Sequence, residues 1–124
     1  MSIYKEEIIE HYKNPNNKGN LNNYNVKIRD ENTSCGDELE IEIKINKNKI
    51  EDIKFQGKGC AISLASADIL FDYVKNKNLN EIKKLNKDDI LKLLNIELTE
   101  TRLKCALLSL NTLKSGVKNY ELNN

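Results

Sequence analysis

The fold can be predicted from one stretch of alternating residues, Glu38-Leu39-Glu40-Ile41-Glu42-Ile43-Lys44-Ile45-Asn46. Its apolar side chains occupy every second position, with polar, mostly charged side chains between them. A period of two is typical of a β-strand that has one face in the core and one face in water. We therefore predict a strand over residues 38–46, placed in an antiparallel sheet.

Two shorter stretches extend this strand into a three-stranded antiparallel meander. Val26-Lys27-Ile28-Arg29 alternates in the same way, and a tight turn after the main strand leads to a third strand over 50–55. In the third strand Ile53 and Phe55 face the core, whereas Ile50 is out of phase with them. This mismatch predicts a bulge or a late start of the strand.

Apolar residues at helical spacing dominate the rest of the chain. A first helix is predicted over 4–13, and Asn14-Pro15 ends it because the residue before proline avoids the helical region. Gly57-Lys58-Gly59 is expected to end the third strand, and a largely apolar helix follows over 60–76. The last helix should end near Lys118, with a frayed tail after it.

Two short helices are expected between the long ones, each started by a capping side chain. The expected N-caps of the three later helices are, in order, Asn80, then Asn86 or Asp88, and then Thr99 or Thr101. Strands followed by helices indicate an α+β domain, in which the helices pack on one face of the three-stranded antiparallel sheet. The other face, which carries the charged residues of the main strand, should be wet.

Length and charge limit the classes of function. A chain of 124 residues fits a single domain, because domains usually hold roughly 100–200 residues. Lys and Arg number 20 against 19 for Asp and Glu, and this balance argues against a nucleic-acid partner, which needs a basic surface. No apolar run approaches the roughly 20 residues of a membrane span, and the N-terminus lacks the apolar core of a signal peptide. We therefore expect a cytoplasmic protein with reduced thiols.

The 3 cysteines lie where secondary structure elements begin or end. Cys35 lies in the predicted loop before the main strand, Cys60 at the start of the helix after the glycines, and Cys105 near the start of the last helix. Asp37 follows the first thiol by two residues. If these boundaries meet at one end of the sheet, three thiolates and a carboxylate can form a tetrahedral zinc site or take part in iron–sulfur chemistry.

Neighbouring residues could support thiolates at this site. Gly57 and Gly59 allow close approach of the backbone, and Lys104 adds a cation beside the third cysteine. Unpaired N–H groups at a helix start also favour negative charge. The alternative to a metal site is a structural role for each cysteine: Cys105 would be a buried apolar residue, and the other two cysteines would be turn residues. His11, the only histidine, is expected to be a surface or capping residue rather than a ligand.

Four motifs are spread over nearly the whole chain. They are His11-Tyr12-Lys13-Asn14-Pro15 with Asn17 and Gly19, Cys35-Gly36-Asp37, Gly57-Lys58-Gly59-Cys60-Ala61-Ile62-Ser63, and Arg102-Leu103-Lys104-Cys105 with Leu108-Ser109. In these motifs the chain resembles the U-type iron–sulfur assembly proteins, the SufU/IscU/NifU N-terminal family. The resemblance implies the fold of that family, and it implies that zinc or a nascent cluster is bound by Cys35, Asp37, Cys60 and Cys105. It also implies a pyridoxal-phosphate cysteine desulfurase of the SufS/IscS type as the partner that delivers persulfide sulfur.

The subtype within this family stays open. The segments around Cys60 and Cys105 are similar to SufU, and Lys104 stands where IscU-type scaffolds carry histidine. The stretch 61–104 is too short for the insertion that SufU proteins usually have, so the spacing is similar to IscU. The Leu-Pro-Pro-Val-Lys type motif of IscU proteins is missing, which argues against an Hsp70-type chaperone as a partner.

Two main functions follow from the resemblance, and neither is that of a stand-alone enzyme. In the first, the protein is a zinc-bound sulfur acceptor, and Cys35 is the favoured persulfide acceptor because it lies on a loop rather than at a helix start. In the second, the same residues assemble a transient [2Fe–2S] cluster from iron and sulfur, and Asp37 is the labile ligand that permits release. The recipients would be another scaffold or apo-proteins. A third alternative is a structural zinc module used only for binding.

Overall fold

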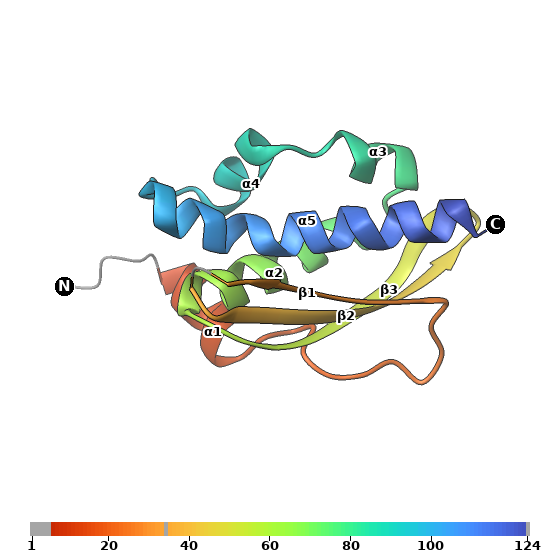
Figure 1. Ribbon diagram of the computed structural model, residues 1–124, viewed down its shortest axis with the longest axis horizontal. Coiled ribbons are helices and arrows are strands. Elements are labelled where there is room, and N and C mark those ends of the chain that lie inside the picture. Colours follow the sequence, from red (N-terminus) through yellow and green to blue (C-terminus); the bar gives the residue numbers. More distant parts are fainter. Residues whose placement is uncertain (1–5, 34, 124) are drawn as a thin grey trace.

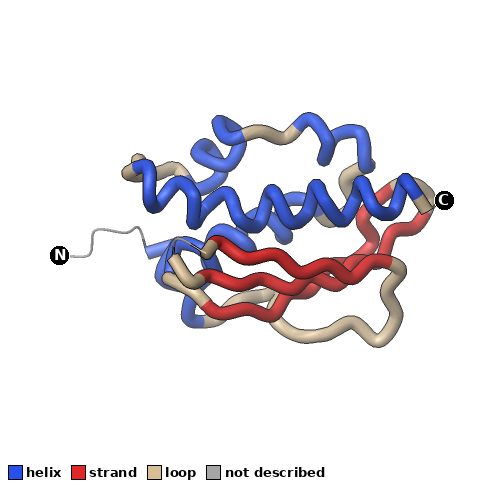
Figure 2. Tube along the Cα trace, in the orientation of Figure 1, coloured by secondary structure: helices blue, strands red, loops and turns tan. Residues whose placement is uncertain are grey.

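The computed structural model describes residues 6–33 and 35–123 of the chain. The elements are, in chain order, α1 (Glu6–Lys13), β1 (Val26–Asn32), β2 (Asp37–Asn46), β3 (Lys49–Lys58), α2 (Ala61–Val74), α3 (Leu79–Lys84), α4 (Lys87–Leu94) and α5 (Glu100–Leu122). The strands form an antiparallel sheet in the order β1-β2-β3. Helices α2 and α5 pack on one face of it, and α3 and α4 form an outer layer against them (Figures 1 and 2). The predicted α+β class is confirmed.

Both edge strands are longer than predicted. β1 continues past Arg29, its predicted end, to Asn32, which pairs with Asp37 of β2. β3 likewise continues past Gly57, the expected break. A Cβ at Gly57 would lie 2.4 Å from the carbonyl oxygen of Glu38, so the glycine fits a tight point of the sheet. Backbone hydrogen bonds to the central strand therefore extend the edge strands beyond what their side chains predict.

The predicted bulge in β3 is confirmed. Lys44 of β2 pairs with Asp52. The next residue, Ile45, pairs with Ile50, so Glu51 is an extra residue on β3. The extra residue turns Ile50 back towards the core, where it is fully buried.

The core lies between the sheet and the two long helices. Phe55 of β3 meets Phe71 of α2 edge to face, with ring centroids 5.7 Å apart. α5 approaches the sheet at Gly116, where a Cβ would lie 3.2 Å from side-chain atoms of Ile28 and Ile43. The glycine therefore lets α5 lie close to β1 and β2.

The outer face of the sheet is wet only in part, which corrects the prediction. The segment between α1 and β1 runs beside β3: Asn17 accepts the N–H of Phe55 at 2.8 Å, and Gly19 donates to its carbonyl at 2.9 Å. The Leu21 N–H of the same segment donates to Glu42 at 2.7 Å, and this glutamate is only 6% exposed. The segment thus covers the open edge of β3 and part of the outer face (Figure 1).

The helix caps follow the prediction in two of three cases. Asn86 caps α4 and Thr99 caps α5, as expected. The predicted Asn80 cap of α3 is wrong, because the side chain of Asn78 accepts the Glu81 N–H at 2.9 Å. The N–H of Leu79, the next residue, donates to the carbonyl oxygen of Asn48 in the β2–β3 turn. This tertiary contact decides where α3 begins.

The first and last helices differ from the predictions at their ends. The predicted start at residue 4 lies outside the described residues, and α1 is described from Glu6. α5 ends at Leu122 instead of near Lys118, so the prediction of a frayed tail is wrong. Lys83 of α3 forms an ion pair with Glu121 at 2.9 Å and holds this last turn. Within the described residues, no helix combines the length and the apolar character needed to cross a membrane.

Candidate metal centre

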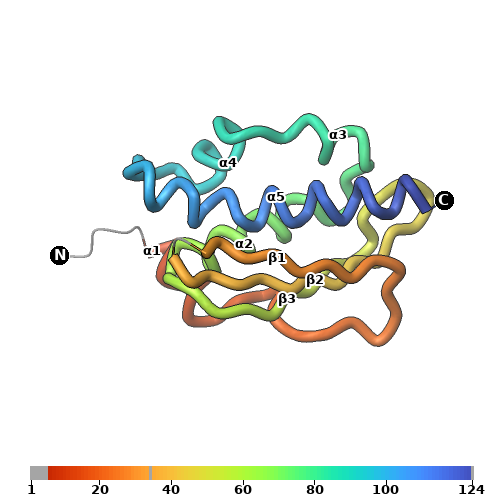
Figure 3. Tube along the Cα trace, viewed as in Figure 1, coloured from red at the N-terminus to blue at the C-terminus, as the bar shows by residue number. Residues whose placement is uncertain are grey.

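Segments far apart in the sequence meet at one end of the molecule. The turn before β2, the start of α2 and the start of α5 all reach this end (Figure 3). Cys35 precedes β2, Cys60 is the N-cap of α2, and Cys105 lies in the second turn of α5. The antiparallel order of the strands causes this meeting, because β2 begins where β3 ends.

The thiols of Cys35 and Cys105 are in contact. The Sγ atoms of Cys105 and Cys35 lie 3.4 Å apart, and the side-chain amide of Asn32 donates to the Cys35 sulfur at 3.4 Å. Cys35, Asp37 and Cys105 each offer one ligand atom, and these atoms lie within 4.8 Å of one another. Cys60 lies outside this group of three, although it bonds directly to Asp37 through its backbone.

Asp37 is held in place by the start of α2. It is only 1% exposed, and its Oδ1 accepts the Cys60 N–H at 3.1 Å. Its Oδ2 accepts the hydroxyl proton of Ser63 at 2.6 Å. Cys60 makes no side-chain capping bond of its own, so the carboxylate from the sheet serves as the cap of this helix. The N-terminal end of a helix carries a partial positive charge, which complements a carboxylate.

Gly59 makes room for this carboxylate. A Cβ at Gly59 would lie 2.5 Å from Oδ1 of Asp37, so a larger residue would displace the carboxylate. Gly57 serves the sheet instead, at its tight contact with β2. Lys104 is exposed beside the buried Cys105, and its support of a thiolate stays a prediction.

Sequence reasoning missed Ser63 as a residue of the site. The available signal was its position three residues after Cys60, where a side chain in the first helical turn can bond a group at the helix start. Its partner, Asp37, lies 26 residues away on another element. That distance in sequence is why only the folded chain reveals the pair.

The thiols of Cys60 and Cys105 differ in acidity. Burial raises the pKa of Cys105, and contacts with Cys35 and Asp37 raise it further, so this thiol keeps its proton in the metal-free protein. Burial also acts to raise the pKa of Cys60, but hydrogen bonds led by the one from the backbone N–H of Ser63, and including one from the Cys105 thiol, outweigh it, and the net pKa is lowered. Cys60 therefore ionises more readily than Cys105.

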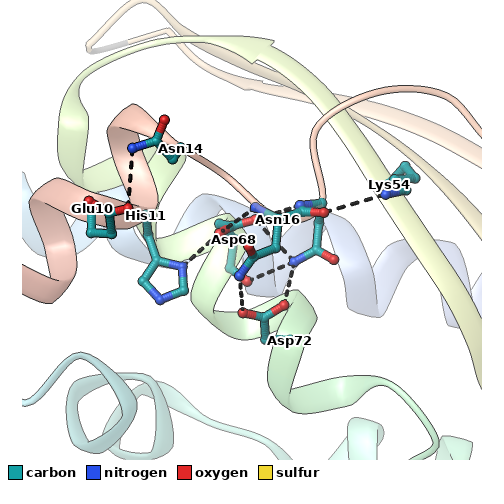
Figure 4. A network of polar contacts seen from close by, with 8 residues as sticks. Glu10, His11, Asn14, Asn16, Lys54, Asp68 and Asp72 are labelled. Carbon is teal, nitrogen blue, oxygen red and sulfur yellow. Dashed lines mark hydrogen bonds and ion pairs between the residues drawn. The ribbon is translucent and has the colours of Figure 1, made fainter.

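His11 belongs to a separate polar cluster (Figure 4). Its Nδ1 lies 2.6 Å from Oδ2 of Asp68, a fully buried residue of α2, and its side chain is 17% exposed. The expectation of a surface or capping histidine is therefore wrong. Ligand atoms of His11, Asp68 and Asp72 lie within 4.8 Å of one another. Both oxygens of Asp68 already accept N–H groups, from Asn16 and Asn17 among others, so this cluster fastens the N-terminal segment to α2.

The sequence profile of the NifU-like N terminal domain matches residues 3–124. The chain belongs to this family. The family indicated by the four motifs is thereby confirmed. Among relatives of this NifU-like domain, the zinc-dependent sulfurtransferase SufU of Bacillus subtilis (strain 168) is 34% identical over an alignment 137 positions long, which spans 97% of this chain and 92% of SufU. The iron–sulfur cluster assembly scaffold protein IscU of Escherichia coli (strain K12) is 32% identical over an alignment 127 positions long, which spans 95% of this chain and 94% of IscU.

Solved structures share the fold of this NifU-like domain. A crystal structure from Fervidobacterium islandicum AW-1, assigned as an iron–sulfur cluster assembly scaffold protein for the SUF system, has a TM-score of 0.80 and 28% identity. The match covers 93% of this chain and 96% of that one. The N-terminal NifU-like protein of Brucella abortus has a TM-score of 0.84 at 16% identity, over 98% of this chain and 96% of its own. The second likeness concerns the fold alone.

Proposed function

We propose that this protein works in iron–sulfur cluster assembly as a zinc-bound sulfur acceptor, which receives persulfide sulfur from a cysteine desulfurase. The observation that carries the proposal is the 3.4 Å contact between the thiols of Cys35 and Cys105, with the buried carboxylate of Asp37 beside them. A relative with 34% identity, SufU of Bacillus subtilis, is named a zinc-dependent sulfurtransferase. Such a protein is a sulfur carrier rather than a stand-alone enzyme.

The chemical types of the donor atoms at this site fit zinc. The proposed ligands are Cys35, Asp37, Cys60 and Cys105, which supply three thiolates and one carboxylate. Zinc binds such ligands in a tetrahedron, and at a Zn–S distance of about 2.3 Å two thiolates lie roughly 3.8 Å apart. The 3.4 Å between Cys35 and Cys105 is close to that separation. Zinc, when bound, keeps the thiols deprotonated and shields them from other reactions.

Cys35 is the proposed acceptor of sulfur. It lies in the turn before β2 and is partly exposed, whereas Cys105 is 2% exposed. The Cys35 thiolate attacks the outer sulfur of the desulfurase persulfide, so that a new S–S bond forms on Cys35 while the S–S bond on the desulfurase breaks. The desulfurase cysteine leaves as a thiolate, and no external oxidant or reductant is needed. A recipient scaffold or apo-protein would take the sulfur from Cys35 by the same exchange.

Desulfurase turnover with and without this protein tests the proposal. We expect the zinc-loaded protein to raise turnover and to carry one additional sulfur on the Cys35 peptide in mass spectrometry. Cys35→Ala should abolish both effects. Cys105→Ala also removes a proposed ligand, so it controls for loss of zinc. If only Cys105→Ala abolishes sulfur acceptance, Cys35 is not the acceptor, and a desulfurase indifferent to the protein would reject the function itself.

A second candidate is a scaffold on which the same residues assemble a [2Fe–2S] cluster. The fixed carboxylate of Asp37 favours it, because a harder oxygen donor among thiolates offers a labile bond for release. IscU of Escherichia coli, named a scaffold protein, is 32% identical. Anaerobic incubation with iron, cysteine and desulfurase should then produce the absorption of a cluster. A rise in desulfurase turnover without that absorption would reject the scaffold.

A purely structural zinc module is the third alternative. It predicts that zinc removal unfolds the domain and that the desulfurase turns over equally with and without the protein. Circular dichroism after chelation, combined with the turnover measurement, separates this alternative from the other two.

A further inference from the structure

Ser63 touches three of the four proposed ligand residues. It lies in the first turn of α2 and is only 3% exposed. Its Oγ lies 2.6 Å from Oδ2 of Asp37, 3.3 Å from the carbonyl oxygen of Cys105 and 3.7 Å from the Sγ of Cys60. A buried hydroxyl at the centre of the site is therefore shared between a carboxylate, a carbonyl and a thiol.

The hydroxyl of Ser63 has one proton to donate, so one of these acceptors receives it. The 2.6 Å contact with Asp37 lies in the range of charge-assisted O–H···O⁻ bonds, about 2.5–2.7 Å, and it is the shortest of the three. The proton therefore goes to Asp37. The second oxygen of that carboxylate is held by the Cys60 N–H at 3.1 Å.

We propose that Ser63 is a positioning residue that sets how firmly Asp37 binds the metal. The inference rests on the zinc site of the proposed function. Each carboxylate oxygen accepts one hydrogen bond from the start of α2 and keeps a lone pair for a metal. With both bonds present, the carboxylate of Asp37 has a fixed orientation. Without the Ser63 hydroxyl, Oδ2 loses its bond and the carboxylate can rotate about its Cβ–Cγ bond.

The expected consequence is weaker metal binding without loss of a ligand. Hydrogen bonds that orient metal ligands typically change metal affinity by about 10–100-fold when they are removed. Ser63→Ala should therefore raise the zinc dissociation constant by about 10–100-fold. Ser63→Thr keeps the hydroxyl and should recover most of the affinity.

The chain offers a matched control on the same helix. Ser66 is 2% exposed, and its Oγ has no hydrogen-bond partner among the described residues. Ser66→Ala makes the same chemical change one turn further along α2, and it should leave zinc affinity within about twofold of the wild type. Competition with a chromogenic zinc chelator measures all of these affinities, and circular dichroism checks that each variant is folded.

A double-mutant cycle with Asp37→Ala separates positioning from a general structural effect. If Ser63 acts through Asp37, then adding Ser63→Ala to Asp37→Ala changes zinc affinity by less than about twofold. A purely structural serine would instead lower the affinity by the same factor in both backgrounds.

The outcomes distinguish the inference from the function on which it rests. A wild-type protein that binds no zinc rejects the zinc site and the inference together. A wild-type protein that binds zinc, with Ser63→Ala equal to Ser66→Ala, overturns the inference alone. Additive losses in the Asp37→Ala background also overturn it. A selective loss for Ser63→Ala, restored by Ser63→Thr and absent in the Asp37→Ala background, supports it.

Discussion

Replacing Asp68 with asparagine should loosen the N-terminal segment from α2. The carboxylate is fully buried and accepts hydrogen bonds on both oxygens (Figure 4). Oδ1 accepts the N–H of Asn17 at 2.8 Å and its side-chain amide at 3.0 Å. Oδ2 contacts Nδ1 of His11 at 2.6 Å and accepts the Asn16 N–H at 3.1 Å. Asparagine has the same shape but carries an NH₂ group in place of one carboxylate oxygen. The groups that donate to that oxygen in the wild type would then face the NH₂ group, which is itself a donor.

The size of the effect follows from these contacts. A hydrogen bond to a charged group contributes about 1.5–3 kcal/mol, so the loss of two amounts to about 3–6 kcal/mol. We therefore expect Asp68→Asn to lower the free energy of unfolding by about 4 kcal/mol. For a domain of this size that corresponds to a fall in Tm of roughly 12–20 °C.

Urea and thermal unfolding, followed by circular dichroism, measure this change. Both should be run on zinc-saturated and on chelator-treated protein, so that the metal site does not hide the loss. Asp72→Asn is the comparison variant: it makes the same substitution one turn along the same helix, at an exposed residue that accepts the side-chain amides of Asn16 and Asn17, and it should cost at most about 1 kcal/mol. If Asp68→Asn costs no more than Asp72→Asn, the buried carboxylate of Asp68 is not what fastens the segment and the reasoning is refuted.

Three further predictions concern the metal centre. Gly59→Ala should weaken zinc binding by at least about tenfold, because the new Cβ would lie 2.5 Å from Oδ1 of Asp37; an unchanged chelator-competition curve would contradict this. In the metal-free protein, iodoacetamide should label Cys60 before Cys105, because the pKa of Cys60 is lowered and that of Cys105 is raised; equal rates in peptide mass spectrometry would contradict it. Zinc affinity should rise with pH by about tenfold per pH unit for each proton released, because zinc must displace the proton that Cys105 holds. A flat pH profile in the same competition assay would show that no thiol proton leaves.

The main elements could be predicted because their signals are local. Side chains alternate along 38–46, and the phase error at Ile50 marks the bulge, so neighbours in sequence carry all the information. The ends of elements could not be predicted in the same way. β1 reaches Asn32 because β2 offers it backbone partners, and α5 reaches Leu122 while α3 supplies Lys83 as an ion-pair partner. These partners are distant in sequence, and no local pattern encodes them.

For the candidate ligands too, the sequence predicts the residues and the tertiary structure decides their contacts. Cys35, Asp37, Cys60 and Cys105 could be named from their motifs, because thiols and carboxylates are the chemical types that metals select. How they meet was decided by the tertiary structure. Antiparallel pairing of β2 with β3 brings the first two cysteines to one end of the sheet, and the packing of α5 adds the third.

The sequence by itself determined the family, the class of fold and the chemical types at the candidate site, since each of these depends on residue identity and short-range spacing. Only the tertiary structure decided the contacts of single side chains. It placed His11 on Asp68 instead of on the surface, and it joined Asp37 of the sheet to Ser63 of the first helical turn after the sheet. The physical reason is that a hydrogen bond depends on distances between atoms in space, and residues 26 or 57 positions apart acquire those distances only when the core has packed.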